Sequence, residues 1–346
     1  MNIKEFIKRN DTQNQFEVLK NSFSQVEKAW SNKINLGNIE GAKINSVLIA
    51  GLGGSAIGGD LLLNLFESEL KIPVTVIRNY FLPTYINEST LVIAVSYSGD
   101  TEETISALKQ SINSNCKIIC ISSGGKIEKI SREKNLNYIS IPPGFQPRYA
   151  LWIIFFTLLK IFHLLNLIPD LDNFVLKITD LLKRKAAEYS ANNNRAAALA
   201  EMILGYIPVI YSAAGYSTAL GIRFKTQINE NSKMHAFQNN IPAMNHNEII
   251  GWETHTSSRA EFIVINLLDD SYSDRIKKRF LITSELISQS GTQIINLESD
   301  EKEFRIRMID LLYLCDWISY YLGVLGNYDP SSIENIKYLK KNLAEN

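Results

Sequence analysis

Short apolar runs alternate with segments of helical periodicity along the first half of the chain. The runs at residues 46–50, 74–77, 91–95, 117–121 and 138–141 predict strands. The segments 56–66, 101–112 and 126–132 between them repeat apolar positions every three or four residues, which predicts helices. Apolar strands that alternate with helices are typical of a parallel sheet covered on both faces. We therefore predict a doubly wound α/β domain.

The same order of elements recurs in the second half. An apolar run at 208–212 and a small-residue turn loosely repeat the strand and turn near residue 50. Further strands are expected at 261–266 and 292–296, and helices at 218–228, 273–289, 302–322 and from Asp329-Pro330-Ser331 to residue 340. The pattern predicts two tandem flavodoxin-like domains with mainly parallel sheets. Their expected limits are 41–150 and 194–346, with a helical segment at 1–40 and connecting helices at 151–193.

One apolar segment, residues 150–168, has almost the length of a membrane-spanning helix, which needs about 20 apolar residues. Lys160 and His163 interrupt it, and no second segment of this kind is expected. A helix buried in the protein is the favoured interpretation. A surface covered by a partner subunit and a membrane span are the alternatives.

Composition narrows the class of protein. The 346 residues contain 36 Lys and Arg against 36 Asp and Glu, so no net field favours nucleic acid or an anionic membrane. The three cysteines, Cys116, Cys120 and Cys315, lie in apolar segments and indicate no disulfide framework. Residues 1–20 are polar and lack the apolar core of a signal peptide. A cytoplasmic protein fits these features.

The segment 96–104, SYSGDTEET, lies where a predicted buried strand turns into a helix. The first turn of a helix offers backbone N–H groups and the positive end of the helix dipole to an anion. Ser96, Ser98 and Thr101 add hydroxyls that can donate hydrogen bonds to a phosphate without fixed charge. The segment therefore predicts a site for a phosphorylated small molecule, and a sugar phosphate in particular.

A glycine-rich turn follows the first predicted strand. We expect Gly53, Gly54 and Ser55 to contact a ligand, whereas Gly58 and Gly59, inside the next helix, allow close packing. The turn also fits the G-x-G-x-x-A dinucleotide fingerprint, so a nicotinamide enzyme is an alternative. That fingerprint expects an acidic residue after the next strand, and Arg78 stands there instead.

The second half carries residue types suited to proton transfer. Glu230 lies at the end of a predicted helix among Asn, Ser and Lys, and His246 lies between two asparagines. A solvated helix end is the alternative for Glu230. A metal site is the alternative for His246, together with His235, His255 and Glu248. The spacing of these residues matches no compact pair of metal ligands, so no metal is predicted.

Five motifs in this order carry a family resemblance: GLGGSAIGGD, SYSGDTEET, PPGFQPRYA, NENSK and NHNEIIGWE. Together they resemble the bifunctional phosphoglucose/phosphomannose isomerase family, which is built from two sugar-isomerase (SIS) domains. The resemblance runs from residue 46 to the C-terminus. It implies that the hydroxyls of Ser96, Ser98 and Thr101 bind the phosphate of a hexose phosphate. The turn at Gly53, Gly54 and Ser55 is implied to assist them.

The resemblance also implies the catalytic residues. Glu230 matches the base that moves a proton between C1 and C2, and Arg148 matches the arginine near the developing enediolate. His246 matches the ring-opening histidine, which the family's dimer supplies from the neighbouring subunit. A lysine of the last helix assists ring opening, with Lys340 the first choice and Lys337 the second. Neither a cofactor nor a metal is implied.

The expected function is a cytoplasmic aldose–ketose isomerase of glucose 6-phosphate and fructose 6-phosphate. The family's acceptance of mannose 6-phosphate is linked to a threonine before the last helix, and Ser331 or Ser332 is expected to supply that hydroxyl. Two other functions remain open. One is a phosphosugar-binding SIS regulator without catalysis, and the other is an isomerase of a different phosphosugar.

Overall fold

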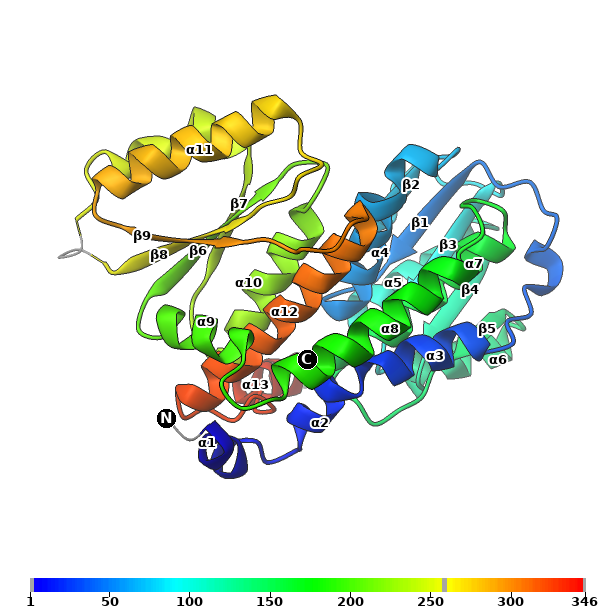
Figure 1. Cartoon of the computed structure of the whole chain (residues 1–346). Helices are drawn as coiled ribbons and strands as arrows, with labels where there is room; N and C mark the ends of the chain where they lie inside the picture. The colour runs from blue at the N-terminus through cyan, green and yellow to red at the C-terminus, as the bar shows by residue number, and fades with distance from the viewer. Residues whose placement is uncertain (1–2, 257–259, 345–346) are drawn as a thin grey trace. The chain divides into compact units, whose positions relative to one another are not determined.

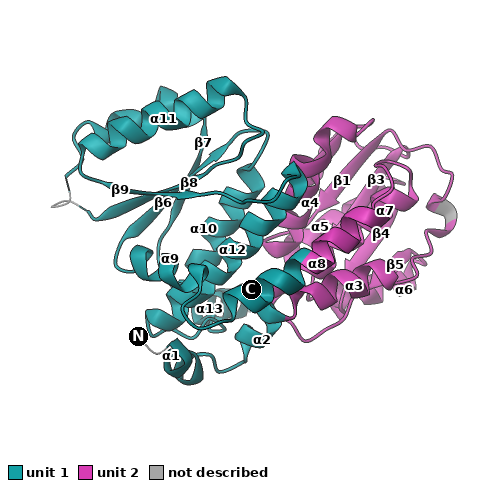
Figure 2. Cartoon of the chain, in the orientation of Figure 1, with its two compact units in different colours: residues 1–20, 181–346 teal, residues 21–180 magenta. Residues whose placement is uncertain are grey.

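A five-stranded parallel sheet organises residues 21–180, which form one of two compact units in the computed structural model (Figures 1 and 2). We call this part unit 2. Unit 1 comprises residues 1–20 and 181–346. The structure describes residues 3–256 and 260–344. The domain limits expected from the motifs stay a prediction.

The strands of unit 2 follow the order β2-β1-β3-β4-β5, and every neighbouring pair is parallel. The strands are β1 (Ser46–Ala50), β2 (Val74–Ile77), β3 (Thr90–Val95), β4 (Lys117–Ser122) and β5 (Asn137–Ser140). The helices are α3 (Ser22–Ser31), α4 (Gly54–Phe66), α5 (Glu102–Asn113), α6 (Gly125–Glu133), α7 (Leu151–Leu164) and the start of α8 (Asp172–Tyr189). Short 3-10 turns are η1 (Gly37–Ile39), η2 (Glu67–Glu69) and η3 (Pro147–Ala150).

Alternate residues of the unit 2 strands face different helices. Leu48 of β1 packs in a cluster with Ala107 of α5, whereas Ile49 faces α4. A Cβ on Gly59 would lie 2.9 Å from the Val76 side chain and 3.2 Å from that of Ile49. The interpretation of Gly59 as a packing glycine is therefore confirmed, and both faces of the sheet are covered.

Unit 1 contains a four-stranded parallel sheet in the order β7-β6-β8-β9. Its strands are β6 (Ile207–Ala213), β7 (Phe237–Ile241), β8 (Phe262–Leu267) and β9 (Gln293–Leu297). Its helices are α1 (Ile3–Asn10), α2 (Gln15–Lys20), α9 (Arg195–Ile203), α10 (Thr218–Ser232), α11 (Asp274–Gln289), α12 (Phe304–Leu325) and α13 (Glu334–Ala344), with turns η4 (Ala243–His246) and η5 (Glu248–Trp252). The predicted fold of two parallel α/β sheets is confirmed.

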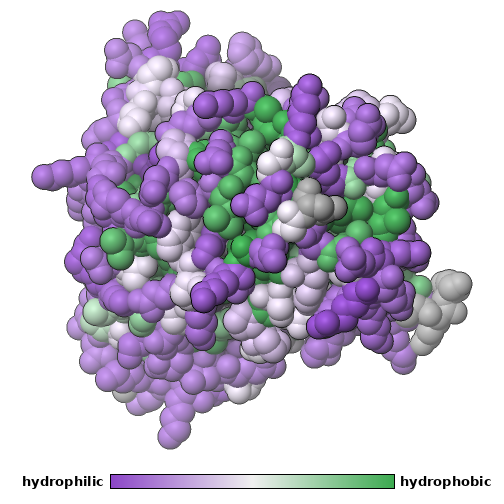
Figure 3. All heavy atoms as spheres, turned by 90° about the vertical axis from the view of Figure 1, so that its right-hand side faces the viewer, coloured by the Kyte–Doolittle hydropathy of each residue, from purple (hydrophilic) through white to green (hydrophobic). Residues whose placement is uncertain are grey.

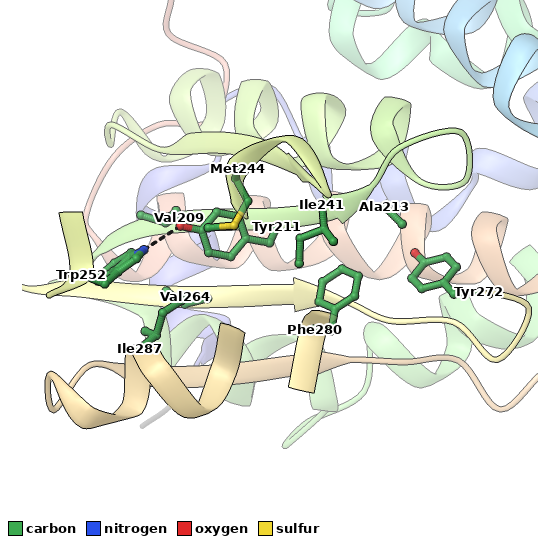
Figure 4. Packing of buried hydrophobic residues seen from close by; sticks show 10 residues of the cluster. All are labelled: Val209, Tyr211, Ala213, Ile241, Met244, Trp252, Val264, Tyr272, Phe280 and Ile287. Carbon is green, nitrogen blue, oxygen red and sulfur yellow. Dashed lines mark hydrogen bonds between the residues drawn. The ribbon is translucent and has the colours of Figure 1, made fainter. Parts of the chain in front are cut away.

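One face of the unit 1 sheet packs on α11 and the segment that follows β7. Figure 4 shows this core, in which Tyr211 of β6 lies among Met244, Trp252 and Val264. The indole N–H of Trp252 donates a hydrogen bond of 2.9 Å to the Tyr211 hydroxyl. These contacts fix the segment 242–252, which carries His246, against the sheet.

Strand β7 was not expected from the sequence. Its residues Phe237–Ile241 read FQNNI, without a run of apolar residues. The strand lies at the edge of the sheet, and its amides bond to polar groups of β6. The Ser212 hydroxyl donates a hydrogen bond of 2.7 Å to Asn240 Oδ1 and accepts one of 2.8 Å from Gln238 Nε2. Edge strands need no continuous apolar pattern, which is why periodicity failed here.

The apolar segment expected near residues 150–168 forms α7, which packs inside unit 2. In the helical stretch Pro147–Leu164, 78% of the residues are buried, so the interpretation as a buried helix is confirmed. The expectation of no second such segment was wrong. Helix α12 is equally apolar and longer, and its residues from Ile306 to Leu325 are all buried. Both helices have the burial of core helices in a folded protein.

The surface turned to the viewer in Figure 3 is mainly hydrophilic, with hydrophobic residues visible between the hydrophilic ones. In unit 2 a few large apolar side chains are well exposed, among them Phe81 at 72% and Leu176 at 66%. Most apolar side chains of this unit are instead buried between the sheet and its helices.

A buried ion pair joins α10 to α12 in unit 1. Arg223 donates two hydrogen bonds of 3.0 and 3.1 Å to the carboxylate of Asp316. Gln227 adds a third bond of 3.0 Å to the same carboxylate. The side chains of the pair are only 2% and 1% exposed. Burial raises the pKa of Asp316, and the nearby Arg223 opposes that rise. The pair fixes the rotation of α10, the helix that ends near Glu230.

Replacing Asp316 with Ala should lower the free energy of unfolding by about 3–5 kcal/mol, because Arg223 would stay buried without its counter-charge. Urea denaturation of both proteins measures the change. Glu334→Ala is the control, since it removes the exposed Lys337–Glu334 pair and should cost less than about 1 kcal/mol. Equal losses in the two variants would contradict the assigned importance of the buried pair.

Candidate functional site

The segment between β3 and α5, residues 96–101, forms a loop that we call the hydroxyl loop. Ser96 Oγ lies 2.8 Å from Thr101 Oγ1, and the Gly99 N–H donates to Ser96 Oγ at 3.1 Å. The Thr101 side chain makes no capping hydrogen bond to α5. Ser96 is buried and Ser98 is exposed. The loop therefore holds hydroxyl groups at the positive end of α5, the arrangement that suits an anion.

A second turn, at Gly124 and Gly125, supports the hydroxyl loop from the end of β4. Gly99 has a φ of +75°, and a Cβ there would lie 1.8 Å from the Gly124 carbonyl oxygen. The Ile127 N–H donates to the Gly99 carbonyl at 3.0 Å, and the Lys126 N–H donates to Asp100 at 3.1 Å. Only glycine allows this approach of two backbones.

The glycine-rich turn after β1 lies beside the hydroxyl loop, since β1 and β3 are neighbours. A Cβ on Gly51 would lie 2.8 Å from the Val95 carbonyl oxygen at the end of β3. Gly53, with a φ of +51°, precedes the first residue of α4, Gly54. Ser55 in the first turn of α4 is 6% exposed. The chain reverses its direction across the sheet at this point, which is where open α/β sheets bind ligands.

Arg148 lies in η3, against the start of α4. A Cβ on Gly54 would lie 3.0 Å from the Pro147 carbonyl oxygen and 3.7 Å from Arg148 Cα. The Arg148 side chain is 3% exposed, and its guanidinium lies 5.3 Å from the centre of the Tyr149 ring. The residues beside the carboxyl ends of β1 and β3 are thus Gly53, Gly54, Ser55, Ser96, Ser98, Thr101 and Arg148.

Glu230 lies in the last turn of α10 in unit 1 and is half-buried. Its neighbours hold that turn to α12: the Asn231 amide donates to Ser319 Oγ at 2.9 Å, and Ser232 Oγ donates to the Ser319 carbonyl at 2.8 Å. A Cβ on Gly323 would lie 2.4 Å from the Asn231 carbonyl oxygen. This close packing gives Glu230 a fixed backbone position.

The turn before α13 also packs on Gly323. Gly323 is the residue that contacts the end of α10, and a Cβ on it would lie 3.5 Å from the Pro330 side chain. Ser331 is 2% exposed, and its Oγ has no hydrogen-bond partner within the described ranges 3–256 and 260–344. Ser332 is half-buried. Of the two serines expected to carry a hydroxyl here, Ser331 is thus the one with an unsatisfied buried hydroxyl group.

His246 is exposed at the end of η4, and its neighbours in the motif are anchored. Asn245 donates to Thr283 Oγ1 of α11 at 2.8 Å. Glu248 accepts from the Tyr211 hydroxyl at 2.7 Å and from the Asn239 amide at 2.6 Å. Burial and the Glu248 carboxylate raise the pKa of Tyr211 above its usual range. No sequence pattern indicates this role of Glu248, because its partners lie 37 and 9 residues away.

The metal alternative also named His235 and His255. His255 packs against the rings of Trp252 and Phe262, at 5.4 and 5.2 Å, and His235 is exposed. In the part of the chain that the structure describes, no group of three His, Cys, Asp or Glu side chains could hold a metal ion.

The two candidate lysines lie on α13 and are both exposed. Lys337 forms an ion pair of 2.8 Å with Glu334.

Arg78, the residue that stood against the dinucleotide fingerprint, pairs with Asp60 of α4. Burial raises the pKa of Asp60, and Arg78 opposes that rise.

A separate cavity of about 300 Å³ lies in unit 1 at the carboxyl ends of β8 and β9. Asn266, Asn296 and Lys277 line it together with the carboxylates of Asp270 and Glu298. These carboxylates make it a poor phosphate site, and none of the predicted residues lines it.

Two family models match the two halves of the chain. Residues 42–164 match the SIS domain, and residues 192–343 match the bacterial phospho-glucose isomerase C-terminal SIS domain. A bifunctional phosphoglucose/phosphomannose isomerase of Caldicellulosiruptor bescii is 38% identical over 95% of this chain and 99% of its own length. A D-glucosamine-6-phosphate 4-epimerase of Sulfolobus acidocaldarius is 34% identical over 68% of this chain and 72% of its own.

A solved structure of a hypothetical protein from Thermus thermophilus has the same fold. Its TM-score is 0.77 at 14% identity, and the match covers 99% of this chain and 92% of that one. The family model over the C-terminal half and the relative that matches nearly the whole chain both extend to the motifs around Glu230 and His246. The chain therefore belongs to the bifunctional phosphoglucose/phosphomannose isomerase family.

Proposed function

We propose that the protein is a metal-independent isomerase that interconverts glucose 6-phosphate and fructose 6-phosphate. Mannose 6-phosphate is proposed as a further substrate. The observation that carries the proposal is the hydroxyl loop, where Ser96 and Thr101 lie 2.8 Å apart at the start of α5. The full-length relative from C. bescii, named for both isomerase activities, supports the choice of hexose phosphates.

The phosphate would be the part of the substrate that the hydroxyl loop binds. The exposed Ser98, Thr101 and the first-turn N–H groups of α5 would donate to its oxygens, with the turn at Gly53–Ser55 beside them. Binding of a group that does not react fixes the reacting carbons, and such positioning can lower a barrier by about 7–11 kcal/mol at most.

The chemistry needs a base, a ring-opening acid and a cation. Glu230 would move a proton between C1 and C2 through an enediolate, and Arg148 would stabilise the negative oxygen of that intermediate. His246 and Lys340, with Lys337 second, would open the sugar ring. The exposure of His246 supports its supply across the interface of a homodimer. We propose a cytoplasmic location.

The activity is tested by incubating the purified protein and fructose 6-phosphate with EDTA, and following glucose 6-phosphate and mannose 6-phosphate. Formation of both supports the proposal. The epimerase relative from S. acidocaldarius makes glucosamine 6-phosphate the second substrate to test. Epimerisation of that sugar without turnover of fructose 6-phosphate would favour an enzyme of another phosphosugar. Thermal stabilisation by hexose phosphate without any turnover would favour a phosphosugar-binding regulator.

Glu230→Gln should lower kcat for fructose 6-phosphate by about 10²- to 10⁴-fold, because the amide cannot accept the carbon-bound proton. Affinity for fructose 6-phosphate, measured by calorimetry, should change little. Glu201→Gln, at an exposed position of α9, is the control and should keep full activity. A Glu230→Gln variant with near-normal kcat would remove Glu230 as the base.

Gly99→Ala should abolish measurable binding of fructose 6-phosphate, because the new Cβ would overlap the Gly124 carbonyl and displace the hydroxyl loop. Calorimetry of the variant against the wild type measures the loss. Gly41→Ala is the matched control: Gly41 has a φ of +71°, close to the +75° of Gly99, but no atom lies within 4 Å of its Cβ position. Normal binding by Gly99→Ala would show that the loop geometry is not required.

Ser331→Ala should lower the initial rate of mannose 6-phosphate formation relative to glucose 6-phosphate. A lost hydrogen bond of ordinary strength corresponds to a change of about 2- to 10-fold in that ratio. Ser332→Ala, one residue along the same turn, should leave the ratio unchanged. The opposite pattern would assign the specificity hydroxyl to Ser332, and no effect in either variant would contradict a role for this turn.

A further inference from the structure

Tyr97 lies between the two serines of the hydroxyl loop, and its hydroxyl contacts a different segment of unit 2. The side chain is 6% exposed. Its hydroxyl donates to the Pro142 carbonyl at 3.0 Å and accepts from the Phe145 N–H at 2.8 Å. Pro142 and Phe145 belong to the segment 142–147, which leads from β5 into η3 and Arg148. The Tyr97 side chain thus joins the hydroxyl loop to the approach to Arg148.

The main chain of Tyr97 is held as firmly as its side chain. Its carbonyl oxygen accepts from the N–H of Ser123 at 2.9 Å and from Ser123 Oγ at 2.6 Å. Burial raises the pKa of the Tyr97 hydroxyl, and the bond from Phe145 opposes that rise. The hydroxyl therefore keeps its proton at neutral pH and remains a donor. Tyr97 is a fixed point from which the segment 142–147 is supported.

The segment 142–147 needs such support because its sequence offers few backbone bonds of its own. Pro142 and Pro143 have no N–H group, and Gly144 takes a φ of +103°. Among the described residues, Phe145 is the first after the two prolines whose N–H donates a hydrogen bond, and the acceptor is the Tyr97 hydroxyl. The Phe145 ring also packs on the Tyr97 ring, with 6.4 Å between centroids.

Arg148 follows three residues after Phe145 and is supported on its other side by α3. The Gln25 amide donates to the Tyr149 carbonyl at 2.8 Å, and the Ile153 N–H donates to Gln25 Oε1 at 3.2 Å. The start of α4 is the third support, since the backbone of Gly54 lies against Pro147 and Arg148. Of these three supports, Tyr97 is the one that belongs to the hydroxyl loop.

We propose that Tyr97 is a positioning residue, which sets the place of the Arg148 guanidinium relative to the phosphate held by the hydroxyl loop. The inference rests on the proposed function, because it assigns Arg148 to the reacting centre. The phosphate and the enediolate are the two ends of one substrate, so the protein must bind both at the same time. A residue that bonds both segments keeps their two binding groups at the matching separation, and a misplacement of about 1 Å can cost about 10²-fold in rate.

Tyr97→Phe removes both hydroxyl bonds and keeps the ring. It should lower kcat by about 10- to 100-fold with little change in KM, because the phosphate contacts remain. Tyr138→Phe is the matched control, since the Tyr138 hydroxyl bonds only to Ser122 among the described residues and should leave kcat unchanged. A rise in KM alone, or equal kcat in Tyr97→Phe and the wild type, would overturn the proposal.

The action through Arg148 is tested by a double-mutant cycle. In an Arg148→Ala background, Tyr97→Phe should cause no further loss of kcat, because the group that it positions is absent. Additive losses would show that Tyr97 acts on something else. A variant that merely loosened the fold would lower kcat in both backgrounds.

A readout without turnover separates this inference from the proposed function. Phenylglyoxal modifies accessible arginines, and peptide mass analysis locates the product. Arg148, 3% exposed, should react faster in Tyr97→Phe than in the wild type or in Tyr138→Phe, whereas the exposed Arg132 should react equally in all three. A wild type without isomerase activity would contradict the proposed function, and unchanged Arg148 reactivity would contradict the placement by Tyr97.

Discussion

The direct contact between two backbones, at Gly99 and at Gly124–Gly125, is the constraint on which the candidate site depends. Any side chain on Gly99 would overlap the Gly124 carbonyl oxygen. The contact brings the end of β4 against the hydroxyl loop and lets the Ile127 N–H bond to Gly99. The loop is therefore fixed before a ligand arrives, and the entropy of ordering it is not lost on binding.

Hydroxyls rather than charges form the proposed phosphate site, and this choice fits the chemistry. Hydroxyl and backbone N–H groups can donate hydrogen bonds to a phosphate without adding a charged side chain to the hydroxyl loop. In the proposed site Ser98 and Thr101 would supply neutral donors, whereas the cation, Arg148, comes from a separate segment. Placement of that segment through Tyr97 and Gly54 then matters as much as the presence of the guanidinium.

The sequence predicts the parts of the molecule that are set by local pattern. Buried strands such as β3 are apolar at almost every position, and the motif SYSGDTEET locates the hydroxyl loop without a structure. Strand β7 was not predicted, because an edge strand that bonds through Gln238 and Asn240 has no run of apolar residues. The role of Tyr97 escaped for another reason: its partners lie 45 and 48 residues away, and only the fold brings them together.

The central claim is that the phosphate of a hexose phosphate binds at the hydroxyl loop. The most direct test is a crystal structure of the protein with fructose 6-phosphate bound. The account predicts phosphate oxygens within about 3 Å of Ser98 Oγ, Thr101 Oγ1 and the first N–H groups of α5, a normal hydrogen-bond distance. A phosphate found instead beside Lys277, in the cavity at the ends of β8 and β9, would contradict it.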